Sequence, residues 1–163
     1  MIVLVGGSNG AFGGMGIVAR CTNAVVMSEE ARLSMSGPEV IESANGVEEF
    51  DSRDRALVWR TTGGKHRYLM GDCQSIVPDT VAAFRAAAID AIAAFASGLP
   101  AELTLAALEQ EQAMLAERIE RFGALPDPLD VWTALGMQDP SGIAMLDIEQ
   151  FTAAADGRRA GGY

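Results

Sequence analysis

The sequence predicts an α/β fold that continues into a helical extension. Three observations lead to this prediction. The apolar run Ile2 to Val5 leads directly into a glycine-rich loop, short apolar runs then alternate with helix-like segments, and from residue 79 apolar side chains recur at helical spacing. We expect the α/β core over residues 1–78 and a helical extension, suited to packing against a partner, over residues 79–155. The glycine- and arginine-rich residues 156–163 are expected to form a disordered tail.

In the first half, β-branched and other apolar residues mark the strands, and glycines or polar stretches mark the ends of helices. The expected strands are residues 2–5, 24–27, 32–35 and 75–77, and the expected helical segments are residues 13–21, 39–42 and 55–60. Gly46 is expected to stop the second helical segment. A second glycine loop, this one basic, is expected over residues 61–67.

In the second half, two amphipathic helices are expected. Asp79 is placed to cap the first, whose apolar residues are Val81, Phe84, Ala88, Ile92 and Phe95. The residues Gly98-Leu99-Pro100 are expected to break this helix. The second helix carries Leu105, Leu108, Leu115, Ile119 and Phe122 on one face and a Glu117–Arg121 pair on its polar side. A further helical segment over residues 129–135 follows a proline-rich break.

Composition and charge exclude several classes of function. A net charge of −10 disfavours nucleic acid and anionic lipid as partners, because both require a basic surface. No apolar run reaches the roughly 20 residues that span a bilayer, and the first residues lack the charged region of a signal peptide. We therefore expect a cytoplasmic protein. Two cysteines, Cys21 and Cys73, and one histidine, His66, provide neither a disulfide framework nor a Cys/His zinc site, so no metal is expected.

The loop from Gly6 to Gly16 is the most informative feature of the chain. Its six glycines join an expected strand to an expected helix, where exposed backbone N–H groups can hold a phosphate, a carboxylate or an oxyanion. The glycine spacing is not the G-x-G-x-x-G pattern of dinucleotide sites. Ser8 does not occupy a Gly-x-Ser-x-Gly elbow, and neither cysteine has a histidine neighbour in sequence, so no nucleophile is expected.

Four segments, taken in order, resemble a known family. They are the glycine loop, residues 36–42 (Ser-Gly-Pro-Glu-Val-Ile-Glu), residues 46–51 (Gly-Val-Glu-Glu-Phe-Asp) and residues 58–67 (Val-Trp-Arg-Thr-Thr-Gly-Gly-Lys-His-Arg). Together with Leu129-Asp130-Val131-Trp132, they resemble the β subunit of biotin-independent malonate decarboxylase, in the carboxyltransferase branch of the crotonase-like superfamily. The resemblance implies a partial crotonase-like core. It also implies that the chain corresponds to the second half of such a subunit, whose first half lies upstream.

The resemblance implies a specific reaction and specific partners. The family subunit, paired with a γ-type carboxyltransferase subunit, decarboxylates a malonyl thioester to the acetyl thioester. The substrate is carried on the coenzyme A-like prosthetic group of an acyl carrier protein, and no tightly bound cofactor is expected. Loss of carbon dioxide leaves an enolate, and preorganised N–H donors that face the thioester oxygen lower the barrier to its formation. A second donor is expected from the upstream half or from the partner.

Eight residues are candidates for the site. The resemblance assigns the amides of Gly13 and Gly14 to the oxyanion hole, with Gly10 and Phe12 lining the substrate site, although glycines there also permit close helix packing. Glu39 is a candidate proton donor to the enolate, or simply a first-turn carboxylate favoured by the helix dipole. The basic cluster Lys65, His66 and Arg67 is expected to hold carrier phosphates or the malonyl carboxylate, or to be an ordinary solvated loop.

Two alternative functions stay open at the level of the sequence. One is the carboxyltransferase subunit of a biotin-dependent acyl-CoA carboxylase or decarboxylase, which shares the fold and the oxyanion chemistry. The other is a non-catalytic assembly fragment that presents its helices to a partner. Half of such a core leaves strand edges and apolar surface uncovered, so we expect the isolated chain to self-associate and to be weak or inactive.

Overall fold

The computed structural model describes residues 1–97 and 104–161. Three parallel strands form one sheet in the order β1 (Ile2–Val5), β2 (Ala24–Ser28) and β3 (Ser75–Val77). In the register, Val5 pairs with Met27 and Met27 pairs with Ile76. All five residues of β2 are buried, as expected for the central strand of a parallel sheet covered on both faces. The predicted α/β class is therefore confirmed.

Helices make up most of the remaining structure. Before β3 they are α1 (Gly14–Arg20), α2 (Pro38–Asn45), α3 (Arg55–Thr62) and α4 (Gly64–Leu69). After β3 they are α5 (Val81–Ala96), α6 (Leu105–Phe122), α7 (Pro128–Ala134), the 3₁₀ helix η1 (Pro140–Met145) and α8 (Ile148–Ala155). The helix C-cap at Gly46, with φ 94°, agrees with the predicted stop after α2.

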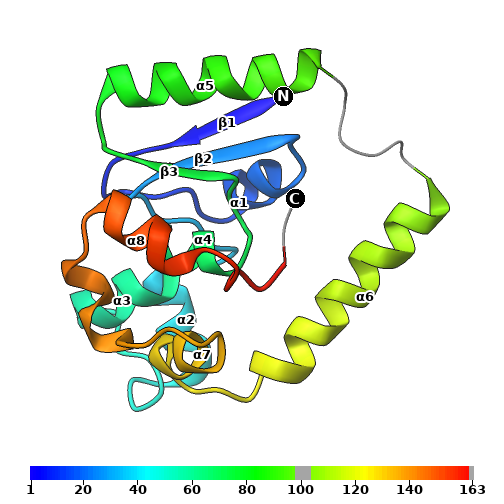
Figure 1. Cartoon of the computed structure of the whole chain (residues 1–163). Coiled ribbons are helices and arrows are strands. Elements are labelled where there is room, and N and C mark those ends of the chain that lie inside the picture. Colours follow the sequence, from blue (N-terminus) through cyan, green and yellow to red (C-terminus); the bar gives the residue numbers. More distant parts are fainter. Residues whose placement is uncertain (98–103, 162–163) are drawn as a thin grey trace.

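The layers are seen in Figure 1, where α5 runs along one side of the sheet and the short helices lie on the other side. The helix α6 extends away from the body of the molecule and rejoins it near Phe122. Although α5 contacts the strands, none of its sixteen residues is buried, and its outward-facing side chains Val81, Ile89 and Ile92 are exposed. A long apolar helix therefore leaves one face uncovered in the isolated chain.

Two buried clusters hold the fold together. The smaller lies between the sheet and α1 and includes Val5, Ala19, Met27 and Leu33. The larger combines Leu69 and Ile76 with the later helices, and its other buried members are Phe122, Val131, Trp132, Leu135, Met137, Ile143, Phe151, Ala155 and Ala160. One core thus spans the boundary expected near residue 78, and it positions α4 against α7, η1 and α8.

The structure corrects two expected elements in the first half. Residues 32–35 form no strand, because Arg32 and Leu33 make only isolated bridges to Gly63 and Ala11. Residues 61–67 form no loop, because α3 continues to Thr62 and α4 begins at Gly64, with Gly63 between them as a cap.

The structure also corrects two expectations in the second half. Thr80, not Asp79, caps α5, since its hydroxyl accepts from the Ala83 N–H. Much of the expected disordered tail is held on the body, because Arg159 donates to two carbonyls and the Ala160 N–H donates to the Leu69 carbonyl at 2.7 Å. The helix break expected at 98–100 lies outside the described residues.

Candidate functional site

The glycine loop leaves the carboxyl end of β1 and enters α1, as the sequence predicts. This edge of an open parallel sheet is where ligands bind in α/β folds. Gly13 is the N-cap of α1 and has φ 59° and ψ −130°, a conformation that side chains with a Cβ rarely adopt. Gly16 lets α1 pack closely against the backbone at Ser34, since a Cβ there would lie 2.4 Å from the Ser34 carbonyl oxygen. The loop therefore requires glycine at both positions.

Three amides of this loop are committed to hydrogen bonds within the chain. The Gly7 N–H donates to the Asp79 carboxylate at 3.0 Å, the Ala11 N–H to the Arg32 carbonyl at 2.8 Å, and the Gly13 N–H to the Met35 carbonyl at 3.0 Å. Gly13 therefore has no N–H left for an oxyanion, contrary to its expected role. Its positive φ shapes the loop instead.

The amide of Gly14 differs from these three. Its N–H makes no hydrogen bond with any residue in 1–97 or 104–161, because it lies in the first turn of α1, where no helix carbonyl can reach it. Gly14 is exposed, and a Cβ placed on it would meet no atom within 4 Å. The Gly14 N–H is thus one of several loop amides, with those of Phe12 and Met15, that have no hydrogen-bond partner in the described part of the chain, and Gly14 lies at an exposed position with no side chain in the way.

Gly10 and Phe12, the other expected members of this site, do lie together. Gly10 has φ 78°, and a Cβ on it would lie 2.8 Å from both the Phe12 ring and the Cβ of Arg32. Phe12 is half-buried. The Phe12 ring and the Arg32 Cβ therefore leave no room for a side chain at Gly10.

Glu39, the candidate proton donor, is not bonded to the glycine loop. It is exposed in the first turn of α2, whose N-cap is Gly37, and its carboxylate makes no hydrogen bond or ion pair with the described residues. A first-turn carboxylate is stabilised by the helix dipole. Of its two expected roles, the geometry supports the electrostatic one at the start of α2.

Lys65 does not belong to an exposed basic cluster. Its side chain is fully buried, and its ammonium ion-pairs with Glu29 at 2.7 Å and donates to the carbonyls of Ile143 at 3.0 Å and Leu146 at 2.6 Å. It also lies over the Trp59 ring at 5.6 Å. All three ammonium hydrogens are used, so Lys65 fastens α4 to the end of η1 and has none left for substrate.

His66 and Arg67 are also engaged inside the protein. The Trp132 indole N–H donates to Nδ1 of the buried His66 at 3.0 Å, and burial, with a smaller effect of Arg67, holds the pKa of His66 well below its ordinary value. Arg67 ion-pairs with Asp72 at 3.1 Å and donates to the Thr61 carbonyl. The expected anion-holding cluster is therefore a set of structural contacts around α4.

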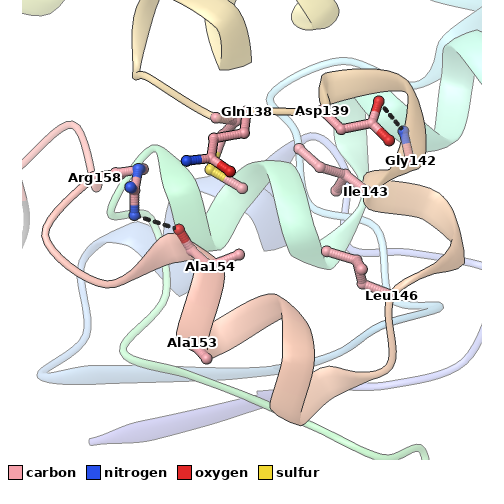
Figure 2. Close-up of a pocket in the computed structure, with 9 residues that line it drawn as sticks. Gln138, Asp139, Gly142, Ile143, Leu146, Ala153, Ala154 and Arg158 are labelled. Carbon is pink, nitrogen blue, oxygen red and sulfur yellow. Dashed lines mark hydrogen bonds between the residues drawn. The ribbon is translucent and has the colours of Figure 1, made fainter.

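A hollow of about 400 Å³ lies among residues 137–139, η1, α8 and Arg158 (Figure 2). In Figure 2, Asp139 bonds the Gly142 amide, and Arg158 turns toward the Ala154 carbonyl. The hydrogen bonds from Ser141 and Gly142 hold the pKa of Asp139 below its usual value. Asp139 and Arg158 are thus bonded to residues of the rim of the hollow, and no residue of the glycine loop lines the hollow.

Sequence reasoning missed two residues near the loop. The Ser28 hydroxyl at the carboxyl end of β2 and the Nε of Arg32 four residues later are buried, and neither has a hydrogen-bond partner among the described residues. Ser28 is fully buried, whereas Arg32 is half-buried. The only signal in the sequence is their position after a buried strand, where ligand-binding side chains gather in α/β folds.

Other classes of site find no support in the part of the chain that is described. No group of three or more His, Cys, Asp and Glu side chains there has the arrangement of a metal site. Among the described helices, none combines the length and apolar character needed to cross a bilayer. Burial raises the pKa of the Cys73 thiol to about 12, so it is not a thiolate nucleophile near neutral pH.

Known proteins that resemble the chain support the expected family. The chain is 36% identical over 173 aligned residues to the malonyl-S-ACP:biotin-protein carboxyltransferase MADC of Malonomonas rubra, and the match covers 95% of this chain and 49% of that protein. The resemblance to malonate decarboxylase subunits is confirmed. No family model matches the chain.

Solved malonate decarboxylase structures agree with this assignment. The fold matches a Pseudomonas malonate decarboxylase hetero-tetramer in complex with malonate, with a TM-score of 0.65 and 34% identity, over 82% of this chain and 46% of the other. It also matches a Pseudomonas MdcD–MdcE hetero-dimer of malonate decarboxylase, with a TM-score of 0.52 and 31% identity, over 71% of this chain and 45% of the other. The chain therefore spans about half the length of the malonate decarboxylase subunits that it matches.

Proposed function

We propose that this chain forms one side of a carboxyltransferase-type active site that generates and stabilises the enolate of a malonyl thioester. One observation carries the proposal: Gly14, in the loop after the carboxyl end of β1, is exposed, its N–H has no hydrogen-bond partner among the described residues, and a Cβ on it would meet no atom within 4 Å. The likeness to malonate decarboxylase subunits supplies the substrate class, a malonyl group held as a thioester on an acyl carrier protein.

The chemistry requires little from the chain beyond this donor. When the bond between the α-carbon and the carboxylate breaks, carbon dioxide leaves. The electron pair of the broken bond forms the enolate, with its negative charge on the thioester oxygen. The Gly14 N–H stabilises the charge on that oxygen. A proton then adds to the α-carbon and yields the acetyl thioester. As expected from the resemblance, the second donor comes from the γ-type partner or from the upstream half of the family subunit.

A second function shares this chemistry. In a biotin-dependent carboxyltransferase, the carboxyl group passes to a biotin-bearing protein instead of leaving as carbon dioxide, and the same enolate forms. The name of the Malonomonas relative, a biotin-protein carboxyltransferase, favours this alternative, whereas the names of the Pseudomonas structures state only malonate decarboxylase. The glycine loop serves both reactions equally well.

Reconstitution separates these functions. The chain is co-expressed with a candidate γ-type subunit and assayed for conversion of malonyl-CoA to acetyl-CoA, with a biotin-bearing carrier protein supplied as carboxyl acceptor, with and without avidin. Turnover that avidin leaves unchanged supports the biotin-independent reaction, and inhibition by avidin supports carboxyl transfer to biotin. A stable complex with no turnover under either condition contradicts both catalytic functions. The remaining interpretation is then a non-catalytic assembly fragment.

A further inference from the structure

The backbone of Arg32 is fixed beside the glycine loop. Its carbonyl accepts from the Ala11 N–H at 2.8 Å, and on its other side Arg32 forms an antiparallel bridge to Gly63. The next residue, Leu33, is buried in the core beneath the sheet. Because the chain is held from both sides and from below, the position of the Arg32 Cβ is set before any ligand binds.

No residue that the structure describes is a hydrogen-bond or ion-pair partner of the Arg32 guanidinium. Its Nε is buried without a hydrogen bond, and no carboxylate within residues 1–97 and 104–161 forms an ion pair with it. Arg60 ion-pairs with Asp127. Arg67 also has a buried Nε without a hydrogen bond, but its terminal nitrogens ion-pair with Asp72 and donate to the Thr61 carbonyl. A buried donor without an acceptor is costly, so such groups in native proteins call for an explanation.

The surroundings of Arg32 indicate which kind of ligand would pair with its guanidinium. The Arg32 Cβ would lie 2.8 Å from a Cβ placed on Gly10, in the same loop that carries the Gly14 N–H. The chain carries a net charge of −10, which repels anionic substrates at long range, so a binding site for such a substrate needs a local cation. With Lys65 and Arg67 both engaged internally, Arg32 is a cation near the loop with donors to spare.

We propose that Arg32 binds an oxyanion of the acyl thioester substrate. The planar guanidinium fork matches a carboxylate or a phosphate, either as the malonyl carboxylate or as a phosphate of the carrier arm. The proposal rests on the proposed function, because that function supplies the substrate class. The proposal goes further because it names Arg32 as the residue that recognises the charge of the substrate. No motif of the sequence identified this residue.

The test uses the complex with its partner subunit and three probes. Malonyl-CoA carries both a carboxylate and phosphates, malonyl-N-acetylcysteamine carries the carboxylate alone, and acetyl-CoA carries the phosphates alone. The variants are Arg32→Met, which keeps the stem without the charge, and Arg32→Lys, which keeps the charge without the fork. Arg55→Met, at an exposed position of α3, is the matched control for loss of one positive charge.

Loss of a charged hydrogen-bonding partner is expected to weaken binding about tenfold or more. If Arg32 holds the carboxylate, Arg32→Met raises the KM of both malonyl thioesters and leaves the dissociation constant of acetyl-CoA unchanged. If it holds a phosphate, the variant weakens binding of both CoA esters and spares malonyl-N-acetylcysteamine. In either case, Arg32→Lys is intermediate and Arg55→Met behaves as the wild type.

Two results would overturn the inference. The first is binding of all three probes by folded Arg32→Met and Arg32→Lys complexes within twofold of the wild type, which leaves the proposed function intact. The second is a wild-type complex that binds none of the probes, in which case the proposed function fails and the role of Arg32 fails with it. Thermal unfolding of each variant establishes that it is folded.

Discussion

The Trp132 indole N–H donates to Nδ1 of His66 at 3.0 Å, and this bond joins α7 to α4 through the middle of the larger core. Because Nδ1 accepts, the imidazole is neutral and carries its proton on Nε2. Protonation would place a hydrogen on Nδ1, opposite the indole N–H, in a largely buried site. The only histidine of the chain is therefore a structural group sensitive to acid.

The first prediction concerns pH and stability. The pKa of His66 is well below 6.5 in the folded chain, mainly because of burial, and returns to about 6.5 on unfolding. The unfolded chain therefore binds the extra proton between these two values, so the free energy of unfolding falls as pH drops below about 6.5. The expected slope approaches about 1.4 kcal/mol per pH unit. Urea unfolding of the wild type at pH 7.5, 6.5 and 5.5 measures it.

His66→Gln is the control for this prediction. Glutamine keeps an acceptor for the indole N–H but does not titrate in this range. The variant is expected to be less stable at neutral pH, since it fits the site less well, but to lose the slope between pH 7.5 and 5.5. An unchanged slope in His66→Gln would assign the pH dependence to other groups.

The second prediction concerns Lys65. Replacement by methionine keeps the volume but leaves Glu29 and the carbonyls of Ile143 and Leu146 without their cation. Breaking a buried, hydrogen-bonded pair by removing one partner costs about 3–5 kcal/mol, and denaturant unfolding of Lys65→Met measures the loss. A variant of normal stability with impaired thioester binding would instead restore the substrate role first expected for Lys65.

The third prediction concerns Ser28. Its hydroxyl is fully buried and has no hydrogen-bond partner among the described residues. Alanine at this position removes an unsatisfied polar group and little volume, so Ser28→Ala is expected to stabilise the chain by about 1 kcal/mol. Urea unfolding is the measurement. A loss of stability in Ser28→Ala would show that the hydroxyl has a partner in solution.

The fourth prediction concerns the uncovered face of α5. Val81, Ile89 and Ile92 are exposed on this helix, and the sheet edges at β1 and β3 are unpaired within the described chain. The isolated chain is therefore expected to self-associate at micromolar concentration. Light scattering should show smaller species for the double variant Ile89→Glu, Ile92→Glu. A wild-type chain that is monodisperse and monomeric would contradict this.

Local patterns identified most of the secondary structure. The strand at residues 2–5 and the strand at residues 75–77 lie where apolar runs placed them, and the Glu117–Arg121 pair forms on α6 at 3.1 Å. These features depend on interactions between residues close together in the sequence, so the local pattern of residue types is enough to predict them. Gly46 ends α2 for the same reason, since a positive φ is required at a single position.

Long-range contacts explain the failures. Gly63 and Gly64 were expected to form a loop, but Gly64 is glycine because α4 begins against β2, where a Cβ would lie 2.2 Å from the Ser28 carbonyl oxygen. Lys65 finds its partners at residues 29, 143 and 146, which no local pattern connects. The same limit applies to the glycine loop. Only the fold shows that the Gly13 N–H donates to the Met35 carbonyl, whereas the Gly14 N–H has no partner among the described residues.

The central claim is that the Gly14 N–H stabilises the enolate, and replacement of Gly14 by proline tests it most directly. Proline is favoured at the first position of a helix and lacks only the N–H, and a side chain on Gly14 meets no atom within 4 Å. Gly14→Ala keeps the N–H and serves as the matched control. In the complex with its partner, we predict a kcat about 100-fold below the wild type for Gly14→Pro and a nearly normal kcat for Gly14→Ala. Equal activity of the two folded variants would contradict the account.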